Sequence, residues 1–472
     1  MLKFPAFLVA GTKSGCGKTS MALGLMAAFT RRGLRVAPFK TGPDFIDPGF
    51  HSLICNRPSH NLDGWMMPEA AIKEVFCQGL KGCDLAIIEG AMGLFDGAPG
   101  IADKGSAAHI AKILGVPVVL VADGQGIGRS ITAMVKGYIE YDEGLNVIGV
   151  IVNKAGSQKH KVILEQALCE LEVPLKAIVQ RDKKVVLPSR HLGLVTVVEH
   201  SGWDRQVHGL CDLVEHHVDL KLLMEILKKS GPDLSTLSPD QSKAWHGYNV
   251  SNRYATPKIA VARDKAFCFY YERNLEILRR FGAELVFFSP LDGDVFSEEI
   301  SGVYLGGGYP ELYAHRLAEN KRLIHMLREG VERGLPVLAE CGGFMFLGKG
   351  LVEGNKFFKW CDLYNSVFEM AKRFQALGYR QAVLQSTCLL GTKGTRFKGH
   401  EFRYSKPINN IDSLASERLT VRDATGAQID LPHFIYKNVF ASYIHIHFDS
   451  NPDVAAAFVK RCMEYAQGDN TN

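Results

Sequence analysis

The hydrophobic residues in the first half of the chain fall into short runs that are separated by helix-length segments. The runs at 7–10, 34–39, 84–90, 116–124 and 146–154 are apolar at consecutive positions and rich in β-branched residues. Parallel strands that are buried on both faces have this pattern, and the crossover helices between them need connections of this length. The pattern therefore predicts a parallel sheet covered by helices on both faces.

The second half has the same architecture but shares no motif with the first half. Its segment 269–281 has the period of a helix, which ends at Gly282. Its last apolar run, 439–448, alternates with polar residues and predicts a half-exposed strand. The fold class predicted for the whole chain is therefore α/β, with two doubly wound domains. The other strands predicted in this half are 258–264, 283–290, 302–310 and 335–343.

The segment 230–257 separates the two halves. It is rich in Ser, Pro, Asn and Gly, lacks an apolar period and follows a helix predicted at 219–229. We therefore expect one domain at 1–229, a linker at 230–257 and a second domain at 258–464. The total length of 472 residues agrees with two or three domains.

Composition narrows the class of protein. The net charge of +5, from 55 basic and 50 acidic residues, is too small and too evenly spread to indicate nucleic-acid binding. The 11 cysteines include no C-x-x-C pair, which is typical of a reducing compartment. No apolar run reaches the ~20 residues of a membrane span, and the N-terminal run is too short for a signal peptide. We expect a cytoplasmic protein without a membrane contact.

The stretch GTKSGCGKT at 11–19 predicts a phosphate-binding P-loop. It follows a strand and precedes a helix predicted at 20–32, which is the context the motif needs. The first glycine, Gly11, stands one place earlier than in the strict motif. Glycines let backbone N–H groups surround phosphate oxygens, a lysine reaches the β- and γ-phosphates of ATP, and a hydroxyl binds Mg²⁺. The residues predicted for these roles are Gly15, Gly17, Lys18 and Thr19.

Acidic residues follow the predicted strands near the P-loop. Asp44 and Asp47 lie in FKTGPDFIDPGF just after one strand, and Glu89 ends another. Turn formation is the alternative role for the two aspartates, but carboxylates at this edge beside a P-loop are suited to Mg²⁺ or to a substrate. We predict that Thr19, Asp44 and Glu89 bind Mg²⁺. Asp96 lies in a glycine-rich loop, where a turn-forming role is at least as well supported.

Two further residues of the first domain are candidates for nucleotide contacts. Asn153 ends a predicted strand and is placed to reach the adenine edge of ATP. Lys13 occupies the loop position at which partitioning and iron-protein relatives carry a lysine that acts across a dimer. A homodimer is therefore one expectation, and a solvated loop lysine is the other.

A second chemical site is predicted around Cys341 in VLAECGGFMFLG. The cysteine lies between an apolar strand and an apolar helix, where the helix N-terminus is expected to lower the pKa of the thiol. Gly307 and Gly308 in GGGYPE, with Gly342, are suited to an oxyanion hole. His445 in SYIHIHF is expected to form a thiolate–imidazolium pair with Cys341. A buried structural cysteine is the alternative.

These motifs together resemble a known family. GGGYPE, AECGG and YIHIHF, in this order, are similar to class I glutamine amidotransferases of the cobyric acid type. GTKSGCGKT, FKTGPDFIDP, HNLDGW and IIEGAMGLFDG resemble the P-loop domain of dethiobiotin synthetase. Their combination, with LPSRHLGL and KGHEFRYS, resembles the cobyrinic acid a,c-diamide synthases over nearly the whole chain. The expected folds are thus a P-loop NTPase-like domain and an amidotransferase-like domain.

The resemblance implies a glutamine-dependent, MgATP-dependent ligase of cobalamin biosynthesis. Cys341 would attack the carboxamide of glutamine, assisted by His445, and release ammonia. The first domain would phosphorylate the a- and c-carboxylates of cobyrinic acid in turn, with Asp44, Asp47 and Glu89 at its site and Asp96 nearby. Phosphorylation supplies the leaving group that a carboxylate lacks. Ammonia passed between packed domains would escape protonation.

The chain departs from the amidotransferase pattern at two positions. Ala339 stands in place of a glycine that precedes the cysteine in many relatives. His447 stands in place of a glutamate that often follows the histidine, so a Cys–His dyad is expected. A metal role for His445 and His447 is disfavoured because no other ligand cluster has suitable spacing. His400 and Glu401 in GHEF are candidates for substrate contacts or for structural roles.

Other functions stay open at this level. Hydrogenobyrinic acid and nickel sirohydrochlorin are alternative tetrapyrroles, and no residue decides among them. GPDFIDP and HNLDGW favour the a,c enzyme over cobyric acid synthase. A MinD-like nucleotide switch, which Lys13 would favour, leaves Cys341 and His445 unexplained. A glutaminase-like binding module without synthetase activity is disfavoured by the intact Lys18 and Thr19.

Overall fold

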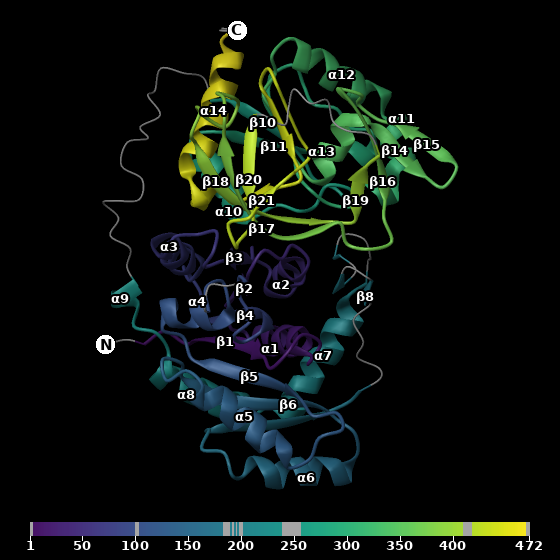
Figure 1. Cartoon of the computed structure of the whole chain (residues 1–472). Coiled ribbons are helices and arrows are strands. Elements are labelled where there is room, and N and C mark those ends of the chain that lie inside the picture. Colours follow the sequence, from purple (N-terminus) through teal and green to yellow (C-terminus); the bar gives the residue numbers. More distant parts are fainter. Residues whose placement is uncertain are drawn as a thin grey trace. The chain divides into compact units, whose positions relative to one another are not determined.

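The computed structural model divides the chain into two compact units, Met1–Ala244 and Trp245–Asn472 (Figure 1). The residues that the structure describes are 3–99, 103–182, 189–190, 193–194, 196–197, 202–237, 256–408 and 418–468.

The first unit is built on a seven-stranded sheet with the order β3-β2-β4-β1-β5-β6-β7, and every neighbouring pair is parallel. All five strands predicted in this half are present. The strands are β1 Ala6–Gly11, β2 Val36–Thr41, β3 His60–Leu62, β4 Leu85–Gly93, β5 Val118–Asp123, β6 Val147–Ala155 and β7 Leu175–Gln180.

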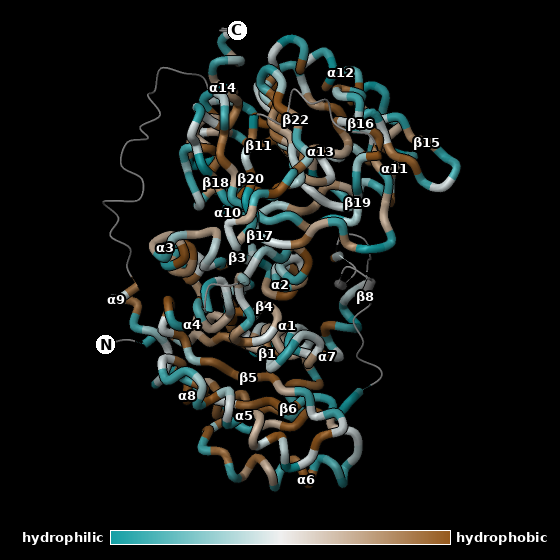
Figure 2. The backbone as a smooth tube through the Cα atoms, viewed as in Figure 1, coloured by the Kyte–Doolittle hydropathy of each residue, from teal (hydrophilic) through white to brown (hydrophobic). Residues whose placement is uncertain are grey.

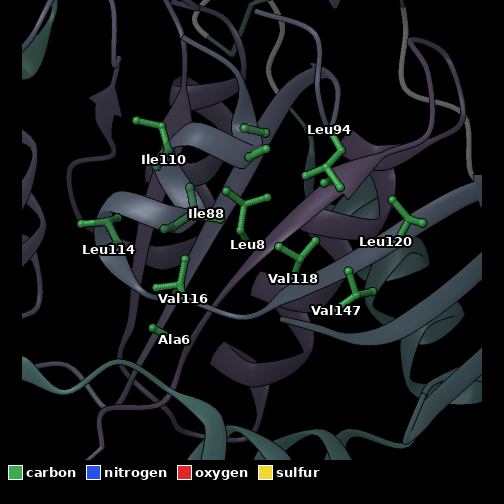
Figure 3. Close-up of a cluster of buried hydrophobic side chains, with 14 of the residues drawn as sticks. Ala6, Leu8, Ile88, Leu94, Ile110, Leu114, Val116, Val118, Leu120 and Val147 are labelled. Atoms are coloured by element: carbon green, nitrogen blue, oxygen red, sulfur yellow. The ribbon is translucent and has the colours of Figure 1, made fainter. Parts of the chain in front are cut away.

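Helices cover both faces of this sheet. Successive residues of β1 enter different cores: Leu8 packs in one cluster (Figure 3), and Phe7 and Val9 pack in the other. Both faces need apolar side chains, which explains the continuous apolar runs along the strands, seen as brown tube in Figure 2. The helices are α1 Lys18–Arg31, α2 Asp47–Cys55, α3 Glu69–Gly79, α4 Ala107–Leu114, α5 Ser130–Glu140, α6 Gln158–Leu168, α7 Asp204–His217, α8 Leu220–Ser230 and α9 Leu234–Leu237. β8 Ser189–Arg190 pairs antiparallel with β9 Gly193–Leu194.

The start of the expected linker belongs to the first unit. Residues 234–237 form α9, and Leu237 is buried in the same core cluster as Leu8. The N–H of Phe4 also donates to the carbonyl of Pro232. These contacts anchor a segment that lacks an apolar period, so its composition alone was misleading. Residues 238–255 of the expected linker lie outside the described residues.

The second unit is built on a six-stranded sheet with the order β11-β10-β12-β13-β23-β22, parallel except at the β22 edge. The doubly wound α/β class is therefore confirmed for both halves. The strands are β10 Lys258–Ala262, β11 Glu284–Phe288, β12 Ile300–Leu305, β13 Val337–Glu340, β22 His433–Tyr436 and β23 Val439–Ser442, and the helices are α10 Glu272–Arg280, α11 Ala314–Glu319, α12 Lys321–Glu332, α13 Gly342–Leu347 and α14 Pro452–Ala466.

Two smaller sheets, which the sequence analysis did not predict, complete this unit. They have the orders β15-β14-β16-β19 and β21-β20-β17-β18-β24. Their strands are β14 Gly348–Glu353, β15 Lys356–Lys359, β16 Tyr364–Met370, β17 Ala376–Leu384, β18 Arg396–Arg403, β19 Ser405–Pro407, β20 Leu419–Arg422, β21 Gln428–Ile429 and β24 His445–Ile446.

The prediction of one half-exposed strand at 439–448 is wrong. The segment forms β23 in the six-stranded sheet and β24 in the five-stranded sheet, and all ten residues are buried. Because the chain passes from one sheet to another, its polar positions face protein on both sides. Throughout the described ranges, no helix combines the length and the apolar character needed to cross a membrane.

Candidate active sites

The P-loop joins β1 to α1 in the first unit. Gly17 has φ 94° at the start of α1, and a Cβ there would lie 1.9 Å from Nδ2 of Asn153. Only glycine fits this position. The first turn of α1 contains no acidic residue, so its backbone N–H groups and dipole are available to a phosphate.

Lys40 on β2 is the centre of a buried ionic cluster beside this loop. Its Nζ lies 2.5 Å from Oδ2 of Asp47, 3.0 Å from Oε1 of Glu89 and 3.5 Å from Oδ2 of Asp44. The lysine side chain is 2% exposed and that of Glu89 is fully buried. Lys18 approaches the same oxygen of Glu89 at 3.6 Å. Two lysines therefore face three carboxylates, all of which the sequence predicted for this site.

The balance of charge sets the pKa values in this cluster. Burial opposes the charge of Lys40, but the surrounding carboxylates outweigh it and raise the pKa of the lysine. Burial also acts against ionised Glu89, yet Lys40 and the hydrogen bond with His51 hold the pKa of Glu89 well below its usual range. Burial and the nearby charges of Asp44 and Glu89 raise the pKa of Asp47. The site thus holds ionised Glu89 beside a carboxyl group that retains its proton more readily.

The oxygen atoms near the P-loop fit Mg²⁺. The hydroxyl of Thr19 donates to Oε1 of Glu89 at 2.6 Å. Two oxygen atoms of the kind that Mg²⁺ binds therefore lie next to each other. Nowhere in the described part of the chain are three or more His, Cys, Asp or Glu side chains arranged to hold a metal ion. Mg²⁺ usually takes one or two carboxylates together with substrate phosphates and water, which this pair allows.

The structure gives the contacts of three other candidate residues of the first unit, Asp96, Asn153 and Lys13. Oδ2 of Asp96 accepts the N–H of Gly93 at 2.8 Å, a turn-stabilising bond. The amide of Asn153 donates to the carbonyl of Cys16 at 3.1 Å and thus contacts the P-loop, while its adenine contact stays a prediction. Lys13 is exposed and lies 3.7 Å from Asp123, and its intersubunit role also stays a prediction.

Sequence reasoning missed Lys40 and His51. His51 on α2 is fully buried, with Nε2 2.8 Å from Glu89 and Nδ1 3.1 Å from Oγ of Ser59. The available signal was a lysine directly after the apolar run that forms β2, since a lysine buried at a strand end requires partners. His51 gave no comparable signal because its importance depends on Glu89, which is distant in sequence.

Cys341 in the second unit stands on a strained elbow between β13 and α13. It has φ 48° and ψ −100°, a conformation that non-glycine residues rarely adopt. Its N–H donates to the carbonyl of Ser442 at 2.8 Å. A Cβ at Gly343 would lie 2.2 Å from the carbonyl oxygen of Leu305. The elbow is therefore held against two strands at once, as expected for a nucleophile on a tight turn, and Cys341 itself is buried.

The other predicted residues of this site lie around the elbow. A Cβ on Gly307 would lie 2.3 Å from Cε1 of His445, so the imidazole packs on this glycine. A Cβ on Gly342 would lie 3.3 Å from the backbone nitrogen of Gly308. The glycine turn after β12, the histidine of β24 and the start of α13 thus converge beside Cys341.

The ionisation expected for this site differs from that in the structure. Burial, with the charges of Glu311 and Glu401, raises the pKa of the Cys341 thiol to about 12. Burial lowers the pKa of His445 to about 3. The N–H of Gly342 at the start of α13 acts to lower the thiol pKa, as predicted, but burial and the two carboxylates outweigh it. Without substrate, the pair is a neutral thiol and a neutral imidazole.

The contacts of three further candidates, His447, His400 and Glu401, are with neighbouring groups of the same domain. His447 is fully buried, with its ring 4.8 Å from that of Tyr271. His400 pairs with His445 across β18 and β24. Glu401 accepts hydrogen bonds from Nε of Arg380 and Nε of Arg403, each at 2.6 Å. A charged group this deeply buried needs such partners.

Glu340, next to the nucleophile, connects β13 to the histidine strand. Its Oε1 accepts the N–H of Ile446 at 2.9 Å, and its Oε2 accepts the hydroxyl of Tyr304 at 2.9 Å. Burial raises the pKa of this carboxyl from 4.5 to about 8, although both hydrogen bonds oppose the shift. The folded protein therefore holds a proton here that the unfolded chain releases near pH 4.5.

This raised pKa predicts a stability that depends on pH. The stabilising contribution of protonated Glu340 is complete below pH 4.5 and is lost as the pH rises towards about 8. The free energy of unfolding should fall by on the order of 3–5 kcal/mol over this range. We expect Glu340→Gln to flatten the fall in melting temperature between these pH values in calorimetry. Glu353→Gln, at an exposed end of β14, is the control. A constant difference between wild type and Glu340→Gln at all pH values would contradict the assignment.

Comparisons with known proteins identify the family of each domain. Residues 7–195 match the CobQ/CobB/MinD/ParA nucleotide binding domain family, and residues 258–453 match the CobB/CobQ-like glutamine amidotransferase domain family. Proteins named cobyrinate a,c-diamide synthase from Caldanaerobacter subterraneus subsp. tengcongensis, Archaeoglobus fulgidus and Picrophilus torridus are 37%, 38% and 39% identical to this chain. Each alignment covers 98% of this chain and 98% or more of the relative.

The fold and the sites define a nucleotide-binding P-loop domain joined to a class I glutamine amidotransferase domain, which supports the use of ATP and confirms the architecture predicted from the motifs. The chain belongs to the cobyrinate a,c-diamide synthase family, whose members are glutamine-dependent amide-forming ligases.

Proposed function

We propose that this protein amidates the a- and c-side-chain carboxylates of cobyrinic acid, using MgATP and ammonia taken from glutamine. The observation that carries the proposal is the pairing, on one chain, of a P-loop beside the Lys40 carboxylate cluster with a cysteine on a strained elbow. Near full-length similarity to proteins named cobyrinate a,c-diamide synthase supports the substrate.

In the synthetase half, a substrate carboxylate oxygen attacks the γ-phosphorus of ATP, which gives an acyl phosphate and ADP. Both reactants are anions, so positive charge must bring them together. Lys18 and Lys40 are the groups we assign to this role, and Asp44 and Asp47 orient the acceptor. Thr19 and Glu89 would hold Mg²⁺, which screens phosphate charge when bound. Ammonia then attacks the acyl carbon, and phosphate leaves.

In the amidotransferase half, the sulfur of Cys341 attacks the carboxamide carbon of glutamine. Because the free thiol is neutral, His445 must take its proton as the bond forms and pass it to the departing ammonia. The N–H groups of Gly308 and Gly342 are the donors we assign to the oxyanion. Water then hydrolyses the glutamyl thioester to glutamate, which regenerates the thiol.

Product mass tests the substrate assignment. Purified protein with MgATP and glutamine would be given cobyrinic acid, hydrogenobyrinic acid or nickel sirohydrochlorin in parallel. We expect two ADP and two glutamate per cobyrinic acid, and a mass gain of two amides. Equal or faster diamidation of another tetrapyrrole would move the assignment to that substrate. ATP hydrolysis without any amide would instead favour a nucleotide switch.

A further inference from the structure

The short strand that carries His445 lies at the edge of its sheet. Within the described residues, β24 is the last strand of the five-stranded sheet and pairs only with β18. On that side the N–H of His447 donates to the carbonyl of Lys398 at 3.0 Å. A Cβ on Gly399 of β18 would lie 2.2 Å from the carbonyl oxygen of His445, so the two strands approach as closely as glycine allows.

Two buried side chains take the place of a neighbouring strand along the other edge of β24. Oε1 of Glu340 accepts the N–H of Ile446 at 2.9 Å. The amide nitrogen of Asn274, on α10, donates to the carbonyl of Ile446 at 2.6 Å, and the amide oxygen accepts the N–H of Phe448 at 2.9 Å. Both side chains are buried, so these backbone groups find in them the partners that a dry environment demands.

Glu340 connects the nucleophile directly to the histidine strand. It is the last residue of β13 and immediately precedes Cys341, and Ile446, whose N–H it accepts, immediately follows His445. The other carboxyl oxygen accepts the hydroxyl of Tyr304 at 2.9 Å, which fixes the rotation of the group. The spacing between thiol and imidazole therefore depends on the length and direction of one side chain.

Asn274 holds the same segment from a helix. The preceding residue of α10, Arg273, is also buried, and its Nε donates to Oδ2 of Asp449 at 2.9 Å. Two consecutive side chains of α10 thus bind residues 446–449 at three backbone or carboxylate groups. Without the amide of Asn274, one buried N–H and one buried carbonyl would lose their partners, and the strand would have to move to satisfy them.

We propose that Asn274 and Glu340 are positioning residues for glutamine hydrolysis, which hold His445 where its imidazole can take the proton of the Cys341 thiol. The inference rests on the proposed Cys341–His445 step and deepens it, because it says what fixes these two groups relative to each other. The proposal gives neither residue a contact with glutamine. Their loss should therefore lower kcat and leave KM nearly unchanged.

A double-mutant cycle with His445→Ala tests whether Asn274 acts through the histidine. Glutamate release would be measured without a tetrapyrrole for Asn274→Ala, for His445→Ala and for the double variant. We expect Asn274→Ala to lower kcat by about 10–100-fold, because a displacement of about 1 Å in a reacting group has an effect of this size. In the His445→Ala background the same change should alter kcat by less than about 2-fold. Losses that multiply in the double variant would overturn the proposal.

Two changes at Glu340 give an independent test. Glu340→Leu removes the acceptor of the Ile446 N–H and should lower kcat by a similar factor. Glu340→Gln keeps an acceptor, and because burial raises the pKa of the carboxyl to about 8, glutamine also reproduces the neutral form present near pH 7. It should recover most of the activity that Glu340→Leu loses. Equal losses of kcat in the two variants would contradict a positioning role for this hydrogen bond.

Asn320→Ala is the matched control, because this buried asparagine makes the same kind of backbone hydrogen bonds with residues outside β13 and β24. Its amide nitrogen donates to the carbonyls of Pro290 and Asp294, and its oxygen accepts the N–H of Leu323. Alanine there should lower the melting temperature but keep kcat for glutamine near that of wild type. An equal loss of kcat in Asn320→Ala and Asn274→Ala would show a general effect of instability and overturn the proposal.

Failure of the underlying step has a different signature. Glutamine hydrolysis by His445→Ala at the wild-type rate would show that the Cys341–His445 step itself is wrong. A cycle in which His445→Ala loses activity and Asn274→Ala multiplies that loss would instead leave the step standing and remove only the positioning role. Because these assays contain no tetrapyrrole, a wrong substrate assignment would not affect them.

Discussion

Replacing Cys341 with alanine is expected to abolish glutamine-dependent amidation while leaving ammonia-dependent amidation intact. The sulfur is the only group on the elbow able to form the glutamyl thioester, so the glutamine-dependent rate should fall by at least about 10³-fold. Ammonium chloride at alkaline pH supplies free ammonia and bypasses this step. Product mass and ADP release with each nitrogen donor measure the two activities.

Cys361→Ala is the control for Cys341→Ala. Cys361 is fully buried in the same core cluster, and its N–H donates to the carbonyl of Phe346, at the end of α13 that lies opposite the elbow. Alanine there should leave both activities near those of wild type, with only the modest stability loss of a small cavity. If Cys341→Ala fails with ammonium chloride as well, while it remains folded by circular dichroism, the division of labour between the domains is wrong.

Replacing Lys40 with methionine is expected to abolish amidation with either nitrogen donor while leaving the hydrolysis of glutamine intact. The substitution removes the cation that lies within 3.5 Å of three carboxylates, two of them deeply buried. Leaving a buried charge without its partner costs about 3–5 kcal/mol. Amidation should fall by at least about 10³-fold with either nitrogen donor, because Lys18 alone must then offset the negative charges of the phosphate and the acceptor carboxylate. Hydrolysis of glutamine at Cys341 should persist.

Lys112→Met is the control for Lys40→Met, because it also removes a lysine that has two acidic partners. Lys112 contacts Asp103 and Asp142 at the surface of the same unit, and its side chain is one-third exposed. Solvent screens such pairs, so the change in unfolding free energy should stay within about 1 kcal/mol. Amidation should be unchanged. Equal effects of Lys40→Met and Lys112→Met on melting temperature and on ADP release would contradict the central role of Lys40.

The strands and the P-loop could be predicted because their signals are local. A strand covered on both faces must be apolar at consecutive positions, as β1 and β5 are, and Gly17 must be glycine because its φ is positive. The two smaller sheets were missed in part because several of their strands, such as β19, β21 and β24, have only two or three residues, too few to show a period. Residues 439–448 misled for a related reason, since no local pattern reveals a strand that changes sheets.

The sequence by itself determined two parallel α/β domains, a phosphate-binding loop and a cysteine on an elbow. Only the tertiary structure decided which charges compensate one another. Lys40 became the centre of the synthetase site because α2, the turn before it and β4 bring their carboxylates to β2. It also decided that Cys341 and His445 are neutral, because desolvation depends on surrounding atoms from distant parts of the chain.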